Sequence, residues 1–351
     1  MTHLEERMEV DLNQIREWVW KIGQDVEIAL KNSKKTIVLR DEALAYSTVL
    51  GDQPINRDSR ECDRLCHMFI ARYLPGAGIL REMASTIRVN VALERVGDYA
   101  VTICREAMQL PDGLPEKFAI KLDHLADQSI DILLQSRTAF RNGNAELAAA
   151  LIKTANRVQT GMDPIYEELF AEDPNLSGRE MMALFVIFNL LKRVADQAKN
   201  ICDQTVYAVR GIAKMPKVYK ILFLDQPGVG LGQLAVSIGR KNFPETGAFV
   251  CAVPGHSNPP SDELCEFLRE TGLPDNDLET EPLEALEHDF AEFTIIVSLK
   301  GRVSDYIPVV PFHTTPLNWT VSPSADLPEQ YRLLRSEITE LVTLLAGDVA
   351  A

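Results

Sequence analysis

Hydrophobic positions along residues 8–30 recur every three or four residues, which is the spacing of one buried face of an α-helix. The same periodicity continues along the chain to about residue 210. One long helix is expected to run through Asp163 and Pro164. Breaks are expected at the Pro- and Gly-containing segments 52–54, 75–78, 111–115, 142–144 and 172–175. The pattern therefore predicts six helices, arranged as two three-helix bundles.

A twelve-residue stretch of this pattern occurs twice. LERVGDYAVTIC at 93–104 returns as LKRVADQAKNIC at 191–202, an offset of 98 residues (191 minus 93), with seven identical positions. In both copies the apolar positions fall on one helical stripe. Self-similarity at a fixed offset indicates an internal repeat, so we expect related bundles over residues 8–110 and 115–212.

The periodicity changes after residue 217. Short β-rich runs are separated by helical segments, and this alternation is typical of a parallel sheet covered by helices on both faces. Strands are predicted at 218–224, 249–253, 293–297 and 308–311, and helices at 234–240, 261–271, 283–288 and 328–345. The predicted fold class is multidomain α plus α/β: a helical domain (1–214), then a doubly wound parallel-sheet domain (217–351).

The first copy of the repeated stretch carries two carboxylates, Glu94 and Asp98, one helical turn apart. Ile87, Val91 and Val101 lie on the same side, so the stripe is otherwise apolar. Like charges at this spacing repel, and apolar surroundings disfavour ionisation. A metal cation would relieve both effects. The alternative is an acidic pair that faces water and has aliphatic neighbours by chance.

These residues resemble the signature of PhoU proteins, the phosphate-transport regulators. The similarity includes 94–100, the segment 72–81 that enters this helix, and 49–56, and it spans roughly residues 8–212. The resemblance implies an all-helical, cytoplasmic protein that is often a homodimer. It also implies action with the phosphate-transporter ATPase and a sensor histidine kinase, and in several members divalent-metal binding through the acidic motifs.

By this resemblance, Asp52 and Asn56 stand where the neighbouring helix of PhoU proteins carries its own acidic pair. With Glu94 and Asp98 they would offer three carboxylates and one amide oxygen. Oxygen ligands of this kind suit Mg, Mn or Fe(II) better than zinc. The expected metal site therefore lies in the first repeat, with Asn56 as a departure from the all-acidic pattern.

The second repeat departs further from that pattern. Lys192 replaces the glutamate one turn before Asp196, while Asp163 remains and Gln159 stands four residues before it. A lysine can place its ammonium where a cation would sit. We expect a degenerate site in which a Lys192–Asp196 pair replaces the metal.

A glycine-rich loop follows the first predicted strand of the C-terminal domain. Asp225 begins it, and Gly228, Gly230 and Gly232 lead into the next predicted helix, so backbone amides could form an anion cradle. The loop lacks the Lys-Ser or Lys-Thr of a nucleotide-binding loop and the spacing of a dinucleotide fingerprint. It remains a possible ligand loop.

Several segments after residue 217 share one pattern, namely 221–224, 233–235, 261–272, 293–297, 318–323 and 331–345. Together they resemble the low-molecular-weight tyrosine phosphatases and arsenate reductases over about residues 217–346. In that family the loop begins with a nucleophilic Cys and ends with an Arg, and a later Asp-Pro supplies the general acid. Here Asp225, Leu231 and Ser322 stand at these positions. Each lost group is worth orders of magnitude in rate, so the domain is expected to be a pseudo-enzyme. The alternative is that Asp225 forms an aspartyl-phosphate.

Charge and composition narrow the range of partners. The net charge is −15, which argues against nucleic acid or an anionic membrane surface as a partner. Residues 1–216 hold 27 basic and 31 acidic groups and residues 217–351 hold 9 and 20, so the strongest acidity is C-terminal. No apolar run reaches the length of a membrane span, no signal-peptide pattern opens the chain, and six cysteines without a Cys-x-x-Cys unit fit a reducing cytosol.

Three functions follow from these observations. The first is a non-enzymatic regulator of phosphate uptake and phosphate-starvation signalling, with a pseudo-phosphatase accessory domain. The second is a phosphatase or arsenate reductase controlled by a helical domain, against which the missing catalytic groups count. The third is a metal-storage or scaffold protein without a role in phosphate regulation.

Overall fold

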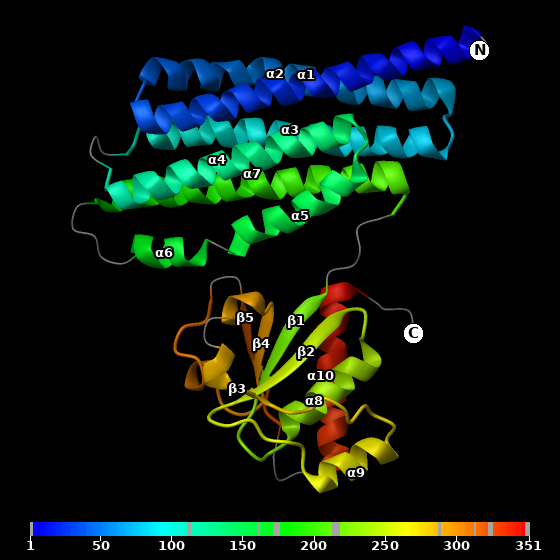
Figure 1. Ribbon diagram of the computed structural model, residues 1–351, viewed down its shortest axis with the longest axis vertical. Coiled ribbons are helices and arrows are strands. Elements are labelled where there is room, and N and C mark those ends of the chain that lie inside the picture. The colour runs from blue at the N-terminus through cyan, green and yellow to red at the C-terminus, as the bar shows by residue number, and fades with distance from the viewer. Residues whose placement is uncertain are drawn as a thin grey trace. The chain divides into compact units, whose positions relative to one another are not determined.

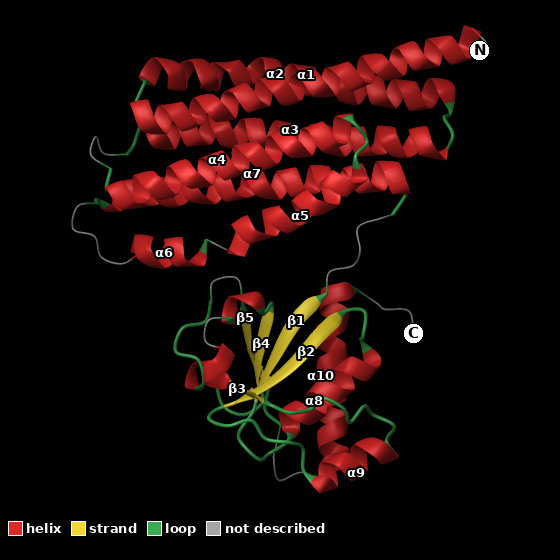
Figure 2. Ribbon diagram, in the orientation of Figure 1, coloured by secondary structure: helices red, strands yellow, loops and turns green. Residues whose placement is uncertain are grey.

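A computed structural model describes residues 3–110, 114–160, 162–170, 176–212, 218–286, 289–311, 314–321 and 326–347. Its contacts divide the chain into two compact units, Met1–Lys214 and Met215–Ala351. The first unit is helical and the second combines strands and helices (Figures 1 and 2). Over the described residues, no helix combines the length and the apolar character needed to cross a bilayer.

The first repeat consists of three long helices, α1 (His3–Leu39), α2 (Glu42–Tyr73) and α3 (Ala77–Ala107), which lie side by side (Figure 1). The turn between the first two is closed by Asp41, whose side chain caps α2 by accepting from the Leu44 amide. The helix expected after the break at 75–78 begins at Ala77. Three antiparallel helices therefore bury their apolar stripes against one another.

Helix α2 is continuous, although a break was predicted at residues 52–54. Pro54 lies inside it, with its side chain exposed. A proline within a helix removes one backbone hydrogen bond and strains the turn before it. Its neighbours Asp52 and Ile55 are buried against the bundle, so packing on both sides of the proline holds the helix together. The predicted break was wrong for this reason.

The second repeat contains α4 (Glu116–Arg141), α5 (Ala145–Thr160), α6 (Asp163–Phe170) and α7 (Gly178–Arg210). The long helix predicted to run through Asp163 and Pro164 is two helices. Pro164 occupies the first turn of α6, where the missing amide proton costs no helical hydrogen bond. The middle helix of this repeat is thus segmented, whereas its counterpart α2 is continuous.

The two copies of the duplicated stretch pack against each other. Helices α3 and α7 lie in contact, and Leu93 and Leu191 belong to one continuous hydrophobic core. Gln197 Nε2 donates to Tyr99 Oη at 3.4 Å. These two residues are 98 positions apart, so equivalent positions of the two repeats meet where the copies cross.

The second unit is built on a five-stranded sheet of order β3-β2-β1-β4-β5, in which every neighbouring pair is parallel. The strands are β1 (Tyr219–Leu224), β2 (Gly247–Val253), β3 (Glu281–Pro282), β4 (Ile295–Ser298) and β5 (Thr315–Asn318). The helices are α8 (Leu231–Asn242), α9 (Asp262–Glu270) and α10 (Leu327–Ala346). The strand order changes direction at β1, so a topological switch point lies between β1 and β4.

The two faces of this sheet are covered differently. Ile221 and Phe223 of β1 pack with α8, α9 and α10, while Leu222 and Leu224 pack on the other face. Among the described residues, three 3₁₀ helices cover that second face: Leu283–Leu286, Phe290–Glu292 and Val303–Asp305. The parallel sheet is as predicted, but among the described residues α-helices cover one face only.

Two local predictions in this unit were wrong. The run 308–311 forms no strand, and the edge strand is Thr315–Asn318 instead. Residues 283–286 form a short 3₁₀ helix in place of the predicted α-helix, and residues 287–288 lie outside the described part of the chain. Both segments are short and proline-flanked, so periodicity gives them little local signal.

Candidate functional site

The acidic residues predicted as metal ligands in the first repeat come from two adjacent helices. Asp52 and Asn56 lie one turn apart on α2, and Asn56 Nδ2 donates to Asp52 Oδ2 at 2.6 Å. Glu94 and Asp98 lie one turn apart on α3. Asp52 is buried (6% exposed), Glu94 and Asn56 are half-buried, and Asp98 is exposed. The four side chains form a graded cluster that runs from the interior to the surface.

Gly97 allows these two helices to approach closely. A Cβ atom at this position would lie 3.1 Å from Asp52 Oδ1 and 3.7 Å from a methyl group of Ile55. The missing side chain therefore makes room for the buried carboxylate. Gly97 was not among the residues predicted to form the site, although a glycine inside a long helix next to Asp98 was a usable signal.

The pKa values of the cluster report electrostatic interaction between its members. Burial raises the pKa of Asp52, and the nearby Asp98 raises it further, while the Asn56 amide and Arg105 act in the opposite direction. Burial, Asp98 and Asp52 also raise the pKa of Glu94. Both carboxyl groups are thus ionised at an energetic cost, because opposite charges do not compensate them fully.

The donor chemistry of this cluster suits a hard cation. Asp52 Oδ1 and Asn56 Oδ1 are buried oxygens without a hydrogen-bond partner, and both can only accept or coordinate. Oxygen ligands of this kind bind Mg²⁺ or Mn²⁺. In the arrangement described, however, no three His, Cys, Asp or Glu side chains converge closely enough to hold a metal ion. The donor atoms are of the kind that the predicted metal prefers, but the carboxylates of this structure do not converge closely enough to bind one ion together.

In the second repeat, only Lys192 and Asp196 of the predicted site have described side chains. Lys192 is buried (8% exposed) and Asp196 is half-buried, but no ion pair joins them among the ion pairs described for the helical unit. The side chains of Asp163 and Gln159 lie outside the described part of the chain. The expected lysine–aspartate ion pair is therefore absent from the ion pairs of the described residues.

In the α/β unit the glycine-rich loop is closed by its own aspartate. Asp225 is 2% exposed, and its carboxylate accepts hydrogen bonds from the amides of Gly232 (2.8 Å) and Gln226 (2.7 Å). Gly228 and Gly230 have positive φ values of 77° and 85°, a conformation that glycine adopts without strain. They turn the chain so that the amides at the start of α8 point at this carboxylate. The amides that were predicted to receive an anion therefore bind the Asp225 carboxylate.

Burial raises the pKa of Asp225, and the amides of Gly232, Gln226 and Leu231 together with Lys300 counteract the rise. Cys251 lies beside this loop, where burial raises the pKa of its thiol well above the ordinary value. Leu231 stands where the low-molecular-weight phosphatases have their arginine, and it is 0% exposed. Ser322 lies outside the described residues. None of the three described side chains is placed as a phosphate ligand or an accessible nucleophile.

An open depression of about 660 Å³ lies beside the loop, at the carboxyl ends of β1, β2 and β4. Lys300 Nζ donates to Gln226 Oε1 at 3.0 Å across it, and Tyr306 Oη donates to the Lys300 carbonyl at 3.0 Å. Open α/β sheets bind ligands at such a switch point. Lys300, the one cationic side chain among the described residues that line this depression, already donates a hydrogen bond to Gln226.

Comparison with known proteins identifies the helical unit. Residues 19–107 and 122–205 each match the PhoU domain, so the two matches coincide with the two structural repeats. The chain is 27% identical over 213 residues to the phosphate-specific transport system accessory protein PhoU homolog of Pseudomonas putida, covering 60% of this chain and 83% of that protein. It is 26% identical over 212 residues to the phosphate-specific transport system accessory protein PhoU of Escherichia coli, covering 60% of this chain and 88% of that protein.

Solved structures agree with these matches. The crystal structure of PhoU from Pseudomonas aeruginosa superposes with a TM-score of 0.56 at 26% identity, covering 58% of this chain and 99% of that one. The phosphate transport system regulatory protein PhoU from Streptococcus pneumoniae has the same fold, with a TM-score of 0.55 at 22% identity and coverage of 59% and 99%. Each repeat of the helical unit therefore matches the PhoU domain, and the unit is similar in fold to the solved PhoU structures.

Proposed function

We propose that this chain is a regulatory accessory protein of a phosphate-transport system. The observation that carries the proposal is the agreement of both helical repeats, in sequence and in structure, with PhoU accessory proteins. The residues that match extend over nearly the whole of those proteins. The helical unit thus corresponds to 83% and 88% of the length of these two proteins, and the α/β unit lies outside the match.

The regulation is proposed to work through protein contacts in the cytoplasm and not through catalysis. The proposed partners are the phosphate-transporter ATPase and a sensor histidine kinase, with the chain itself as a homodimer. The names of the relatives support the link to the transport system. The acidic surface of the chain, net −15, favours a basic protein partner over an anionic one.

The α/β unit is proposed to be a pseudo-phosphatase module that contributes a binding or regulatory surface. The contacts of Asp225 support this proposal, because a carboxylate that occupies the amide cradle excludes a phosphoryl group from it. A buried Asp225 that is saturated by amides is also a poor nucleophile. An aryl-phosphate assay tests the proposal: no turnover is expected, and turnover that disappears in Asp225→Asn would contradict it.

A divalent cation is proposed as a ligand of the acidic cluster in the first repeat. Asp52, Glu94 and Asp98 would hold it, with the Asn56 amide oxygen as the fourth donor. The two unpartnered buried oxygens and the raised carboxyl pKa values support the site. Metal analysis after dialysis against Mn²⁺ should find metal in the wild type and less in Glu94→Ala. Equal content in both would exclude this cluster.

Affinity capture tests the proposed function. The tagged chain is isolated from phosphate-replete and phosphate-starved cells of its own host, and the captured proteins are identified by mass spectrometry. We expect the transporter ATPase or the sensor kinase among them, in amounts that differ between the two conditions. A matched capture with residues 218–351 alone should retrieve neither. Absence of both proteins from the full-length capture in both conditions would contradict the proposal.

A further inference from the structure

A cavity of about 480 Å³ lies inside the helical unit, away from the acidic cluster. Its walls come from α1, α3, α4 and α7, so both repeats contribute to it. Trp20, Val89 and Leu93 supply apolar surface, and Arg16, Arg137 and Arg141 supply positive charge. The volume and the mixture of apolar walls with a few polar groups are those of a small-molecule site.

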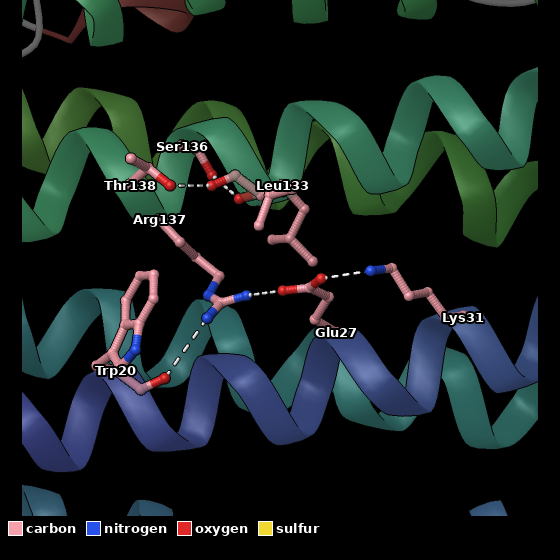
Figure 3. Close-up of polar contacts among 8 residues, drawn as sticks. Trp20, Glu27, Lys31, Leu133, Ser136, Arg137 and Thr138 are labelled. Atoms are coloured by element: carbon pink, nitrogen blue, oxygen red, sulfur yellow. Dashed lines mark hydrogen bonds and ion pairs between the residues drawn. The ribbon is translucent and has the colours of Figure 1, made fainter.

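Arg137 is a buried cation with unused hydrogen-bonding capacity. Its side chain is 3% exposed and pairs with Glu27 through Nη1 at 2.5 Å, as Figure 3 shows. Nη2 reaches only the Trp20 carbonyl, at 3.5 Å, and Nε, which lies against the Gly23 backbone, has no hydrogen-bond partner. A guanidinium has five N–H donors, and two hydrogen bonds leave three of them unused. An under-bonded buried arginine is costly unless something else accepts from it.

The α1 backbone is shaped to admit this side chain. A Cβ atom at Gly23 would lie 2.3 Å from Arg137 Nε, so only glycine leaves room for the guanidinium there. The same guanidinium lies over the Trp20 ring, 4.7 Å from its centroid. Arg137 is thus held firmly at the cavity wall, and a ligand would meet it in a fixed position.

A second guanidinium lies at the same ring. Arg141 is one turn further along α4 and lies 4.2 Å from the Trp20 centroid. Its partner Glu17, at 3.1 Å, has a side chain that is 67% exposed, so solvent screens this pair strongly. Like charges at this helical spacing repel each other. An anion between the two guanidinium groups would remove the repulsion.

The local charge balance also favours an anion. Glu27 pairs with Lys31 at 2.6 Å as well as with Arg137, so one carboxylate serves two cations. Three cations (Lys31, Arg137 and Arg141) against two carboxylates (Glu17 and Glu27) leave one positive charge. This excess occurs in a chain whose net charge is −15. Arg16 adds nothing to it, because Glu82 binds both its Nε and Nη2 atoms.

We propose that this cavity binds a phosphoryl group, with Arg137 and Arg141 donating to its oxygens and Trp20 forming the adjacent wall. Arginine matches phosphate oxygens through paired donors, and two guanidinium groups suit an anion with more than two oxygens. The ligand is either free phosphate or a small phosphate monoester whose body fills the apolar part. Because α1 and α4 belong to different repeats, the bound anion would link the repeats. This inference rests on the cavity and not on the proposed function.

Calorimetric titration of the full chain tests the proposal, with inorganic phosphate in one arm and phenyl phosphate in the other. Saturable binding is expected in at least one arm. The apparent Kd should rise about tenfold or more in Arg141→Gln, because a hydrogen bond to a charged group is lost. The matched control is Arg72→Gln, which removes an exposed, ion-paired arginine outside the cavity. Tighter binding of phenyl phosphate would identify a monoester, and equal or tighter binding of inorganic phosphate would identify the free anion.

The proposal is overturned if neither compound binds saturably to the wild type, or if Arg141→Gln binds as tightly as Arg72→Gln. Hydrogen exchange of the wild type supplies a second measurement that needs no variant. The tighter-binding compound should slow exchange in peptides from both α1 and α4, because it contacts both helices. Binding without slower exchange in these helices would place the ligand elsewhere and also overturn the proposal. None of these outcomes depends on whether a transport protein is captured.

Discussion

Asp52 in the helical unit and Asp225 in the α/β unit are both almost inaccessible to solvent, at 6% and 2% exposure. Both carboxyl pKa values are raised, with burial as the largest cause. The two side chains differ in what surrounds their oxygens. Backbone amides bind both oxygens of Asp225, whereas Asp52 Oδ1 has no hydrogen-bond partner and the Asp98 charge raises the pKa of Asp52 further. Burial alone therefore does not indicate whether an acid serves structure or is available to a ligand.

The difference separates two uses of a buried carboxylate. Asp225 completes the start of α8 and closes a site that could otherwise take an anion, so it stabilises the fold. Asp52 has a buried oxygen without a hydrogen-bond partner and interacts unfavourably with Glu94 and Asp98, so its charge destabilises the fold and suits a cation. Substitutions at the two positions should therefore change stability in opposite directions.

The largest effect is expected for Asp225→Ala. This change leaves the amides of Gln226 and Gly232 buried without an acceptor, which should lower the local free energy of unfolding by about 3 kcal/mol. Hydrogen-exchange mass spectrometry of the full chain measures the change in peptides that cover residues 219–242. The control is Asp326→Ala, which removes the exposed cap of α10 and should cost about 1 kcal/mol. Equal losses in both variants would contradict a special role for Asp225.

Asp52→Asn should stabilise the protein in metal-free buffer, whereas Asp225→Ala should destabilise it. The pKa of Asp52 is raised in the fold, so the ionised group costs stability above that pKa, and the cost disappears as the pH falls and the group is protonated. The variant should be more stable than the wild type at pH 8 by about 1 kcal/mol, and the advantage should shrink toward pH 4. Thermal unfolding at both pH values with a chelator measures it. A variant less stable than the wild type at pH 8 would refute this account of Asp52.

A smaller effect on stability is expected at Gly97, where α2 and α3 approach each other, and Gly51 on α2 serves as the comparison. Gly51→Ala places a methyl group where no other atom lies within 4 Å, so helix propensity alone should stabilise the protein by about 1 kcal/mol. Gly97→Ala brings the same propensity gain but places its methyl group 3.1 Å from Asp52 Oδ1. Crowding should cancel the gain, leaving a net change near zero. Urea denaturation of both variants measures the difference, and equal stabilisation would show that Asp52 does not need this space.

The sequence predicted those parts of the fold that rest on long, regular patterns. The helical stripes and the 98-residue repeat placed α1, α3 and α7, and the alternation of strands and helices indicated the parallel sheet. Predictions failed where a short local signal competed with packing. Pro54 suggested a helix end, but buried neighbours on both sides keep α2 continuous. The proline-flanked run at 308–311 suggested a strand that forms at 315–318 instead.

The candidate sites show the same division. The spacing of Glu94 and Asp98 placed both on one side of α3, and in the structure both interact electrostatically with Asp52, while the metal site stays a prediction. The closure of the glycine-rich loop by Asp225 could not be predicted, because it depends on the backbone angles at Gly228 and Gly230. The cavity around Arg137 was missed as well, since its residues come from four helices and share no sequence motif.

The measurement that tests the proposed function most directly is expression of phosphate-starvation genes in the host organism. Deleting this chain should raise their transcripts in phosphate-replete medium, and the full chain supplied from a plasmid should restore repression. Asp225→Ala should restore it too, provided that the protein accumulates, because the α/β unit is proposed to have no catalytic role. Unchanged transcripts in the deletion strain would contradict a role in phosphate regulation.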